Sequence, residues 1–564
     1  MKKRKEPPLS AIAAKRLREQ GEELSEGMDG SKLSSDVSDA SDEKPPDERV
    51  ESKEPFASQF GNPQQLKDGL VFTLRPGEKV AILGQARLQV RSGFIEVDGV
   101  QYSAGPDWHT LSFPTCHSAP EVRVLPQKHT WNENHSDDDG AIFTLLDYSN
   151  GWSRADPLFQ RYTSVWNVQG ARTFQFLHEG SAHQVCRLHP SWSKLISDFT
   201  ANVYANPVVF VAGPKGSGKS TFSQQLLHAY APLEEVEYLE TDCGQPQFTP
   251  SGLVSLCRAP SMRPFRYDDE EGLRGHHIGH VTAKANPQHY LSAIDDLFSR
   301  SETATCIVNL PGWIKGMGLE IVRDVVHAGL KLPSRTFHVV FLGSASDAAD
   351  VVQCMPGQVT MHYIQEHRPT KASARYHAAD LRALRMMSYF HYSREEKDWI
   401  FRPMCELPPK AVGYGGSTRD VEGVRIMEDV SGEFALAAVN GTVVAVIVTR
   451  ERMPCTELNG VRVVSQPFDP SSSRCLGLAL VRGVDTSTQT LYLTTPIQTA
   501  AITDLQGKGF LVYLERGSLD LPLVEMLPGA PDWGSPLPYL SMEAAEGVGA
   551  QRWRSRRNIQ RRGQ

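Results

Sequence analysis

The chain has 564 residues, a formal net charge of −7, 40% hydrophobic and 22% charged residues, and nine cysteines. This length allows about two to four domains, and the composition is ordinary for a soluble globular protein. No two cysteines form a C-x-x-C pair, which argues against a zinc cluster or a disulfide framework and favours a reducing compartment.

Residues 1–55 are expected to form a disordered tail. Between Glu22 and Glu54 there are twelve acidic residues against four basic ones, and aromatic residues are few. No apolar core follows the opening "MKKRK", so we expect no secretory signal peptide. The basic start fits either a nuclear localisation signal or a plain solvated terminus.

Residues 56–190 are expected to form an N-terminal β domain, because short alternating runs are separated there by Pro-Gly and Gly turns. Across 195–405, the apolar strands "PVVFVAG", "VEYLETD", "TCIVNLPG" and "FHVVFLG" alternate with helical patterns such as "STFSQQLLHAY". Fully apolar strands that alternate with helices predict an α/β domain with a parallel sheet covered on both faces.

Residues 410–540 are expected to form a C-terminal β-rich domain with the strands "FALAAVN", "TVVAVIVTR", "GLALVRGVD", "TLYLTTP" and "GFLVYLE". The most apolar window, "FALAAVNGTVVAVIVT", is interrupted by Asn440, Gly441 and Thr442. A membrane span needs about 20 apolar residues, so this window is predicted to be a hairpin of two buried strands, and we expect no membrane partner. Residues 541–564 form a basic tail that we expect to be loose.

The pattern G-x-x-x-x-G-K-S is completed by Gly213, Gly218, Lys219 and Ser220, between an apolar strand and a helix. Glycines let consecutive N–H groups point at one anion, and the helix start adds its positive dipole end. The lysine can reach the β- and γ-phosphates, and the serine hydroxyl can ligate Mg²⁺. We therefore assign nucleoside triphosphate binding to Gly213, Pro214, Lys215, Gly216, Ser217, Gly218, Lys219, Ser220 and Thr221.

The next strand ends in "YLETDCGQPQFTPSG", where open parallel sheets place their chemistry. Asp242 can bind the metal or take a proton from an attacking hydroxyl, or it can simply cap the turn before Gly244. Glu240, on the same strand face, either supports the metal shell or is a paired buried acid. Gln245 is a candidate to orient the acceptor oxygen or a water.

A third strand ends in "VNLPGWIKGMG", where Pro311 and Gly312 force a turn. Trp313 is therefore expected near the site, where it can stack on a nucleobase, but a core tryptophan behind a turn fits the sequence equally well. Lys315 is a candidate to neutralise acceptor phosphates.

Further along, "KASARYHAADLRALRMMSYFH" carries Arg375, Arg382 and Arg385. The last two are three residues apart and share a helix face. The loop around Arg375 can close over the triphosphate and bring a guanidinium to the transferring phosphoryl group. A solvated helix face is the alternative interpretation of these charges.

The segments "GPKGSGKST", "TDCGQPQFTPSG", "PGWIKGMG" and "SARYHAADLRALRMMSYFH" resemble, in this order, the P-loop polynucleotide 5′-hydroxyl kinases. That family comprises messenger-RNA cleavage-factor kinases and nucleolar kinases of pre-ribosomal RNA processing, and this chain is most similar to the fungal nucleolar branch. The resemblance covers most of the chain beyond residue 55. It implies a kinase domain flanked by N-terminal and C-terminal β-rich domains.

The resemblance also implies roles for single residues. Asp242 would activate the 5′-hydroxyl beside Gln245, Trp313 would hold RNA, and Arg375, with Arg382 and Arg385, would supply the lid. Two positions depart from the family pattern. Leu310 stands where the family has a threonine, which removes a hydroxyl contact to RNA, and Glu240 replaces an aspartate, which puts its metal role in doubt.

Fungal nucleolar members work with a HEPN-type endoribonuclease that cuts the second internal transcribed spacer of pre-ribosomal RNA, and the kinase then phosphorylates the new 5′-hydroxyl. The resemblance therefore implies a nuclear, nucleolar protein with that partner. The family's C-terminal tail reaches into the nuclease, and aromatic and arginine side chains suit such an anchor. Direct binding of the RNA backbone by the same arginines is the rival interpretation. The tail residues concerned are Arg552, Trp553, Arg554, Arg556 and Arg557.

These observations together predict an ATP-dependent RNA 5′-hydroxyl kinase that uses Mg²⁺. A nucleotide-binding scaffold that regulates a partner endoribonuclease without transferring phosphate is the alternative. A GTPase switch is disfavoured because no N-K-x-D motif follows the later strands.

Overall fold

The computed structural model describes most of the chain between residues 63 and 525. The described ranges are 63–125, 140–154, 165, 172–177, 185–186, 189–201, 204–258, 273–302, 305–367, 376–393, 396, 398–400, 402, 404–416, 419–521 and 525. The expected disordered tail and the basic tail with Trp553 and its neighbouring arginines lie outside these residues.

The first sheet has ten strands. They are β1 (Gln64–Leu66), β2 (Gly69–Leu74), β3 (Lys79–Ser92), β4 (Phe94–Val97), β5 (Val100–Ser103), β6 (His109–Phe113), β7 (Ala119–Val124), β8 (Ala141–Asp147), β9 (Phe174–Leu177) and β10 (Val185–Cys186). All pairs are antiparallel except β10 with β7. The long strand β3 pairs with β6, β7, β8 and β9, so it joins most of the sheet.

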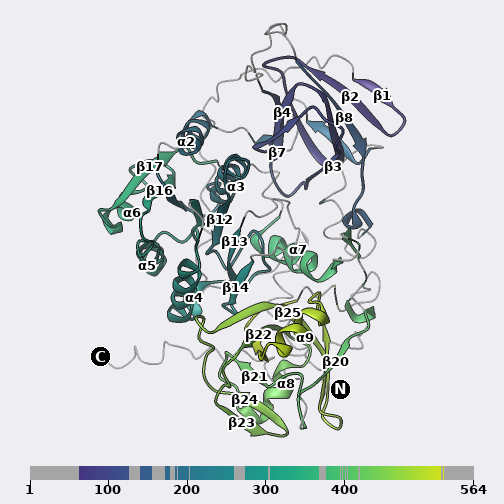
Figure 1. The fold of residues 1–564 in the computed structure, drawn as a ribbon, viewed down its shortest axis with the longest axis vertical. Helices are drawn as coiled ribbons and strands as arrows, with labels where there is room; N and C mark the ends of the chain where they lie inside the picture. The colour runs from purple at the N-terminus through teal and green to yellow at the C-terminus, as the bar shows by residue number, and fades with distance from the viewer. Residues whose placement is uncertain are drawn as a thin grey trace, which may run out of the picture. The chain divides into compact units, whose positions relative to one another are not determined.

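The central sheet has the order β14-β13-β12-β15-β11-β16-β17. Its strands are β11 (Pro207–Ala212), β12 (Val236–Glu240), β13 (Leu253–Arg258), β14 (Arg274–His277), β15 (Thr305–Asn309), β16 (Thr336–Leu342) and β17 (Val359–Ile364). Figure 1 shows β17 with α6 (Ala349–Cys354) at one edge of this sheet and β14 at the other.

This central sheet is mixed, which corrects the expectation of a purely parallel one. The five strands from β12 to β17 in the sheet order are parallel, but β13 pairs antiparallel with both β12 and β14. The chain turns back after β12 through a connection without a helix, and a parallel return needs a crossover that usually contains one. The predicted strands β11, β12, β15 and β16 are confirmed.

Helices cover both faces of the central sheet. The helices of this region are α2 (Pro190–Thr200), α3 (Lys219–Tyr230), α4 (Pro287–Ser299), α5 (Met317–Gly329), α6 and α7 (Ala378–His391). On β11, Val208 and Phe210 pack in one core with side chains of α4 and α5. Val209 and Val211 pack in the other core with side chains of α2 and α3. The continuous apolar run of β11 is therefore explained by burial on both faces.

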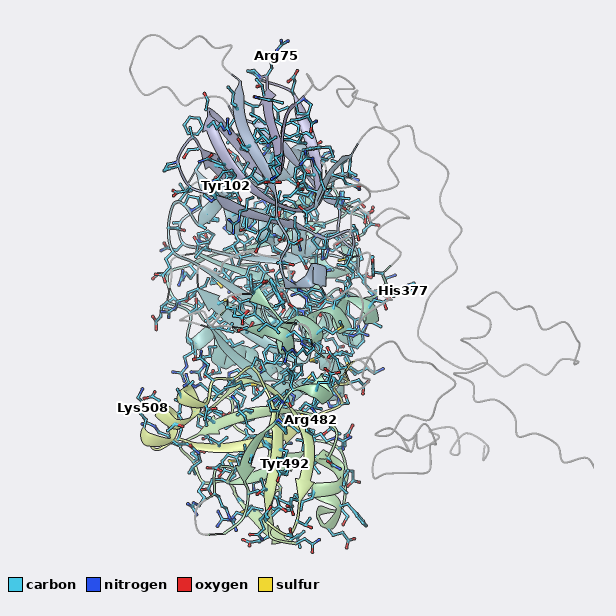
Figure 2. All side chains as sticks on the ribbon, turned by 90° about the vertical axis from the view of Figure 1, so that its right-hand side faces the viewer. Arg75, Tyr102, His377, Arg482, Tyr492 and Lys508 are labelled. Carbon is cyan, nitrogen blue, oxygen red and sulfur yellow. The ribbon has the colours of Figure 1, made fainter. Side chains whose placement is uncertain are left out.

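The third sheet has eight strands, in the order β20-β26-β25-β22-β27-β21-β24-β23. They are β20 (Lys410–Gly413), β21 (Gly423–Ile426), β22 (Val443–Thr449), β23 (Cys455–Leu458), β24 (Val461–Val464), β25 (Ser473–Asp485), β26 (Thr490–Thr494) and β27 (Leu511–Arg516), with the helices α8 (Ala435–Val439) and α9 (Thr499–Gly507). Figure 2 labels Tyr492 on β26 and Lys508 at the end of α9. In the part of the chain that the structure describes, no helix has the length and apolar character needed to cross a membrane.

The prediction of a strand at "FALAAVN" is wrong, because this segment forms α8. Ala435, Leu436, Ala438 and Val439 are buried, which is the spacing of one helix face. Alanine is the strongest helix former, and Gly441, at φ 70°, takes the left-handed conformation that commonly follows a helix end. The second half of the predicted hairpin is a strand, β22.

Candidate functional site

The segments singled out in the sequence meet at one cavity of about 730 Å³. The phosphate loop lines it, together with the turn after β12, the turn after β15, the first part of α7, and a stretch of the first sheet from Phe113 to Pro120. The parallel strands β11, β12 and β15 all end at this cavity, as expected for an open α/β sheet.

The phosphate loop has the backbone that its glycines predict. Gly213, Gly216 and Gly218 have φ angles of 149°, 79° and 96°, and Gly218 is the left-handed residue before α3. A side chain at Gly213 would also lie 2.8 Å from the Ser217 hydroxyl oxygen. Because α3 begins directly at Lys219, its free N–H groups and its positive dipole end are at the loop.

Lys219 is a buried ammonium whose one described hydrogen bond goes to the loop itself. Its Nζ donates to the Pro214 carbonyl at 3.0 Å, and the residue is 8% exposed. Burial lowers the pKa of Lys219 to about 8, and the carboxylates of Asp242 and Glu240 oppose that shift. A desolvated cation with a single carbonyl partner is well suited to bind an anion.

Asp242 caps a turn and lines the cavity. Its Oδ1 accepts the N–H of Gly244 at 2.9 Å and that of Gln245 at 3.3 Å, so the turn-cap interpretation describes one of its oxygens. Among the described residues none donates to Oδ2. Gln245 also lines the cavity.

Glu240 lies behind the cavity wall and is fully buried. It accepts the N–H of Asp242 at 3.0 Å, the N–H of Gln247 at 3.0 Å and the side-chain amide of Asn309. Burial, with a contribution from Asp242, raises the pKa of Glu240 to about 8, and these donors oppose the rise. The arrangement is that of a buried acid that holds the turn after β12 in place.

Asn309, the last residue of β15, connects this acid to the phosphate loop. Its Nδ2 lies 3.0 and 3.2 Å from the two Glu240 oxygens and 3.5 Å from Ser220 Oγ. Its Oδ1 is buried without a hydrogen-bond partner among the described residues. Sequence reasoning missed Asn309, although the rule about strand ends that identified Asp242 also applies to it.

Trp313 is 37% exposed and lines the cavity, so it is not a core tryptophan. Gly318, in the first turn of α5, leaves room for its ring, because a Cβ there would lie 2.2 Å from Trp313 Cγ. Gly312 packs against the phosphate loop, where a Cβ would lie 3.0 Å from both Lys215 Cα and Lys219 Nζ. Pro311 also lines the cavity, and Lys315 is exposed.

The helix α7 brings Arg382 and Arg385 to the cavity, which is not the solvated face that the alternative interpretation expects. The Arg385 guanidinium donates to the backbone carbonyl of Gln247. At the start of α7, the Asp380 carboxylate accepts the N–H of His377, an exposed residue labelled in Figure 2. Arg375 lies outside the described residues.

The first sheet contacts the phosphate-loop helix α3 through hydrogen bonds of Asp98, in the turn between β4 and β5. The Asp98 carboxylate accepts from Gln224 Nε2 at 3.1 Å and from Gln225 Nε2 at 2.7 Å, while the Asp98 carbonyl lies 2.6 Å from His228 Nδ1. All three partners are on α3. Gln247 Nε2 donates to Gln224 at 3.3 Å, so the turn after β12 joins the same set.

Comparison with known proteins agrees with this geometry. A family model described as the mRNA cleavage and polyadenylation factor CLP1 P-loop matches residues 213–392. The polynucleotide 5′-hydroxyl-kinase Grc3 of Aspergillus oryzae is 28% identical, over 78% of this chain and 65% of that protein. The Grc3 of Schizosaccharomyces pombe is 26% identical, over 89% of this chain and 78% of that protein.

Solved structures of Clp1p in complex with Pcf11p share the fold. One, of the wild-type complex, superposes with a TM-score of 0.50 at 13% identity and covers 80% of this chain and 98% of its own. A second, which concerns the basis of ATP loss in a Clp1p point mutant, has a TM-score of 0.51. The resemblance to polynucleotide 5′-hydroxyl kinases drawn from the sequence motifs is therefore confirmed, and so is a P-loop kinase fold. The chain spans slightly less than two thirds of the length of the Aspergillus oryzae relative.

Proposed function

We propose that this protein is an ATP-dependent kinase that phosphorylates the 5′-hydroxyl of RNA. One observation carries the proposal: a single cavity joins the phosphate loop and its buried lysine to Asp242, to an exposed tryptophan and to the arginines of α7. These are the groups that phosphoryl transfer needs, namely a triphosphate cradle, a base, an acceptor platform and cations for the transferred group.

On the donor side, the loop N–H groups and Lys219 bind the β- and γ-phosphates of ATP, and Thr221 lies at the α-phosphate. The lowered pKa of Lys219 reflects burial, and a bound triphosphate stabilises the charged ammonium. The hydroxyl of Ser220 is a hard oxygen ligand that suits Mg²⁺, and the Asp242 carboxylate would hold a water of the bound ion. Glu240 and Asn309 Oδ1, which has no hydrogen-bond partner among the described residues, lie close behind. When bound, Mg²⁺ neutralises charge on the β- and γ-phosphates.

On the acceptor side, Asp242 is the base. Its Oδ1 is held by two backbone N–H groups, which leaves Oδ2 to take the proton of the 5′-hydroxyl as that oxygen attacks the γ-phosphorus. Gln245 orients the same hydroxyl. Trp313 stacks on the terminal base, which is worth about 1–3 kcal/mol and tolerates any base. Lys315, at the edge of this turn, neutralises acceptor phosphates.

Arg382 and Arg385 stabilise charge on the transferring phosphoryl group, together with Arg375 from the preceding segment. The Arg385 guanidinium donates a hydrogen bond to the carbonyl of Gln247, in the turn after β12 that also carries Asp242. Movement of α7 over ATP would therefore also position this turn. Phosphoryl transfer depends mostly on positioning and electrostatics, so these contacts account for catalysis without a covalent intermediate.

The Grc3 relatives and the motifs shared with the nucleolar branch support a finer proposal. The RNA is then the spacer end of pre-ribosomal RNA, the partner is a HEPN-type endoribonuclease, and the protein acts in the nucleolus. The tail from Arg552 to Arg557 would anchor the nuclease. Co-purification with and without residues 551–564 tests this tail, because loss of the nuclease with unchanged transfer to a free oligonucleotide is the expected result.

The kinase activity itself is tested by transfer of labelled γ-phosphate from ATP to an RNA with a 5′-hydroxyl. The same RNA with a 5′-phosphate is the control and should receive no label. Lys219→Ala should reduce transfer by at least about a hundredfold. ATP binding without transfer to any 5′-hydroxyl end would overturn the proposal and identify the chain as a nucleotide-binding scaffold.

A further inference from the structure

A second cavity, of about 380 Å³, lies where the edge of the central sheet meets the third sheet. Arg274 at the start of β14 and Arg300 after α4 line it from one side. The residues that line it from the other side are Val448, Arg450, Glu451, Ser471–Ser473, Arg474 and Phe510. Glu451 is the one acidic residue in this lining, against four arginines, and it is exposed and makes no ion pair with any described residue. None of these residues lines the cavity at the phosphate loop. Figure 1 shows the neighbouring elements α4, β14 and β25.

Two of the guanidiniums share one carboxylate. Asp296 accepts from Arg274 Nη2 at 3.0 Å and from Arg300 Nε at 3.3 Å, and it also lies 2.8 Å from His276 Nε2. Its single negative charge therefore serves two arginines, and the pair keeps a net positive charge. Arg300 also donates to the carbonyl of Ser471 at 3.2 Å, which ties the two sides of the cavity together.

The other two guanidiniums have no carboxylate partner. Arg450 and Arg474 make no ion pair with any described residue, and both lie against the ring of Phe510, with Cζ 4.7 and 5.8 Å from its centroid. Arg474 Nε is buried without a hydrogen bond among the described residues. Burial, followed by the nearby charge of Arg274, lowers the pKa of Arg474. Like charges held together in this way cost free energy unless an anion joins them.

We propose that this cavity binds a backbone phosphate of the RNA strand at a distance from its reacting end. A guanidinium can donate two parallel hydrogen bonds to the oxygens of one phosphate. The hydroxyls of Ser471 and Ser472 are further donors, and neither donates a hydrogen bond to another described residue. An aromatic ring between cations is the composition of single-strand binding surfaces, where a base stacks beside the phosphates it follows. The volume exceeds that of a single inorganic ion, which favours a nucleotide unit of a polymer.

The two cavities are close enough for one RNA strand to reach both. Val281, seven residues after Arg274, lines the cavity at the phosphate loop, so the two sites are at most about 25 Å apart along this segment. A stacked strand covers that length with about seven or eight nucleotides at ~3.4 Å each. The inference rests on the proposed function, since it assumes that the polymer bound at the reaction cavity is RNA.

The test measures binding of the full-length protein to RNAs of four and twenty nucleotides by fluorescence anisotropy, over a range of salt concentrations and without ATP. Arg450→Gln and Arg474→Gln should each raise the Kd for the twenty-nucleotide RNA about threefold to tenfold. Each should also reduce the slope of log K against log salt by roughly 0.7. The Kd for the four-nucleotide RNA should change by less than about twofold, because four stacked nucleotides cover only ~14 Å and engage the cavity at the phosphate loop.

Two variants separate charge from folding. Arg450→Lys keeps the charge and should keep the salt slope, whereas Lys79→Gln removes an exposed cation of the first sheet and should change neither RNA affinity. Phosphate transfer to the four-nucleotide RNA is followed in parallel. Wild-type protein that binds the longer RNA through Arg450 and Arg474 but transfers nothing would contradict the proposed kinase, not this site. Unchanged affinity for the longer RNA in both variants would overturn the site, as would stronger competition by a phosphoserine peptide than by unlabelled RNA.

Discussion

The side-chain amide of Asn309 donates to both carboxylate oxygens of Glu240, at 3.0 and 3.2 Å, and lies 3.5 Å from the hydroxyl oxygen of Ser220. This contact joins the ends of β12 and β15 to the first turn of α3. Glu240 in turn accepts the N–H of Asp242, so the position of the proposed base depends on the amide of Asn309.

Replacing Asn309 by Ala should therefore weaken magnesium use without removing a residue that touches substrate. The half-saturating Mg²⁺ concentration for phosphate transfer should rise roughly tenfold, as is typical when an outer partner of a metal ligand is lost. Leaving the buried Glu240 carboxyl without the Asn309 amide should also cost about 1–3 kcal/mol of stability. Asn286→Ala, which removes the N-cap of α4, is a control that should lower stability but leave the Mg²⁺ requirement unchanged.

Gly312→Ala should lower ATP affinity by about tenfold, because the new methyl group meets the backbone of Lys215 at 3.0 Å. The loop then has to shift, and Lys219 shifts with it. Isothermal titration with a non-hydrolysable ATP analogue measures the effect. Gly357→Ala introduces the same methyl group where no atom lies within 4 Å, and its affinity should equal that of the wild type. Equal affinities for all three proteins would show that the loop does not depend on this contact.

Gly318→Ala should displace the indole of Trp313, since the added Cβ would lie 2.2 Å from its Cγ. We expect the KM for the oligonucleotide to rise about tenfold, consistent with the loss of one stacked base, while the KM for ATP stays the same. The double variant with Trp313→Ala should be no worse than Trp313→Ala alone, because both changes remove one interaction. Gly507→Ala in α9 has open space around it and is the matched helix control. Additive effects in the double variant would argue against a shared cause.

Asp98 should make stability depend on pH. Burial raises the pKa of Asp98 from 3.8 to about 7, so the folded protein binds more protons than the unfolded chain between these values. The contribution of Asp98 to the free energy of unfolding is therefore largest at low pH, and it is lost as the pH rises through about 7. Asp98→Asn is the suitable variant, because asparagine tolerates the φ of 54° at this position. The melting temperature of Asp98→Asn minus that of the wild type should increase from pH 5 to pH 8. A constant difference across that range would refute the assignment.

The phosphate loop and its cavity were predictable because their signals are local. Gly213, Gly218 and Lys219 specify a strand, a tight turn and a helix within a short stretch, and the structure has all three. The segment Ala435–Val439 was predicted wrongly because a short apolar run fits a buried strand or a buried helix equally well by periodicity. Its alanine content was the signal that favoured the helix.

Contacts between distant parts of the chain could not be read from the sequence. Asp98, in a turn of the first sheet, accepts a hydrogen bond from Gln225 of the phosphate-loop helix α3. No local sequence pattern predicts this contact. The second cavity, lined by Arg274 and Arg474, could not be predicted for the same reason. These two arginines are far apart in the chain and come together only because two sheets pack against each other. Each of these arginines taken alone fits a solvated surface residue.

The most direct test of the account is phosphate transfer by Asp242→Asn, measured with its ATP affinity. Asparagine keeps an oxygen for the N–H groups of Gly244 and Gln245, so the turn and the nucleotide site should remain intact. The account predicts that transfer to a 5′-hydroxyl RNA falls by at least about a hundredfold while the Kd for ATP changes less than about threefold. Transfer at the wild-type rate with unchanged ATP binding would contradict it, because the carboxylate would then not be the base.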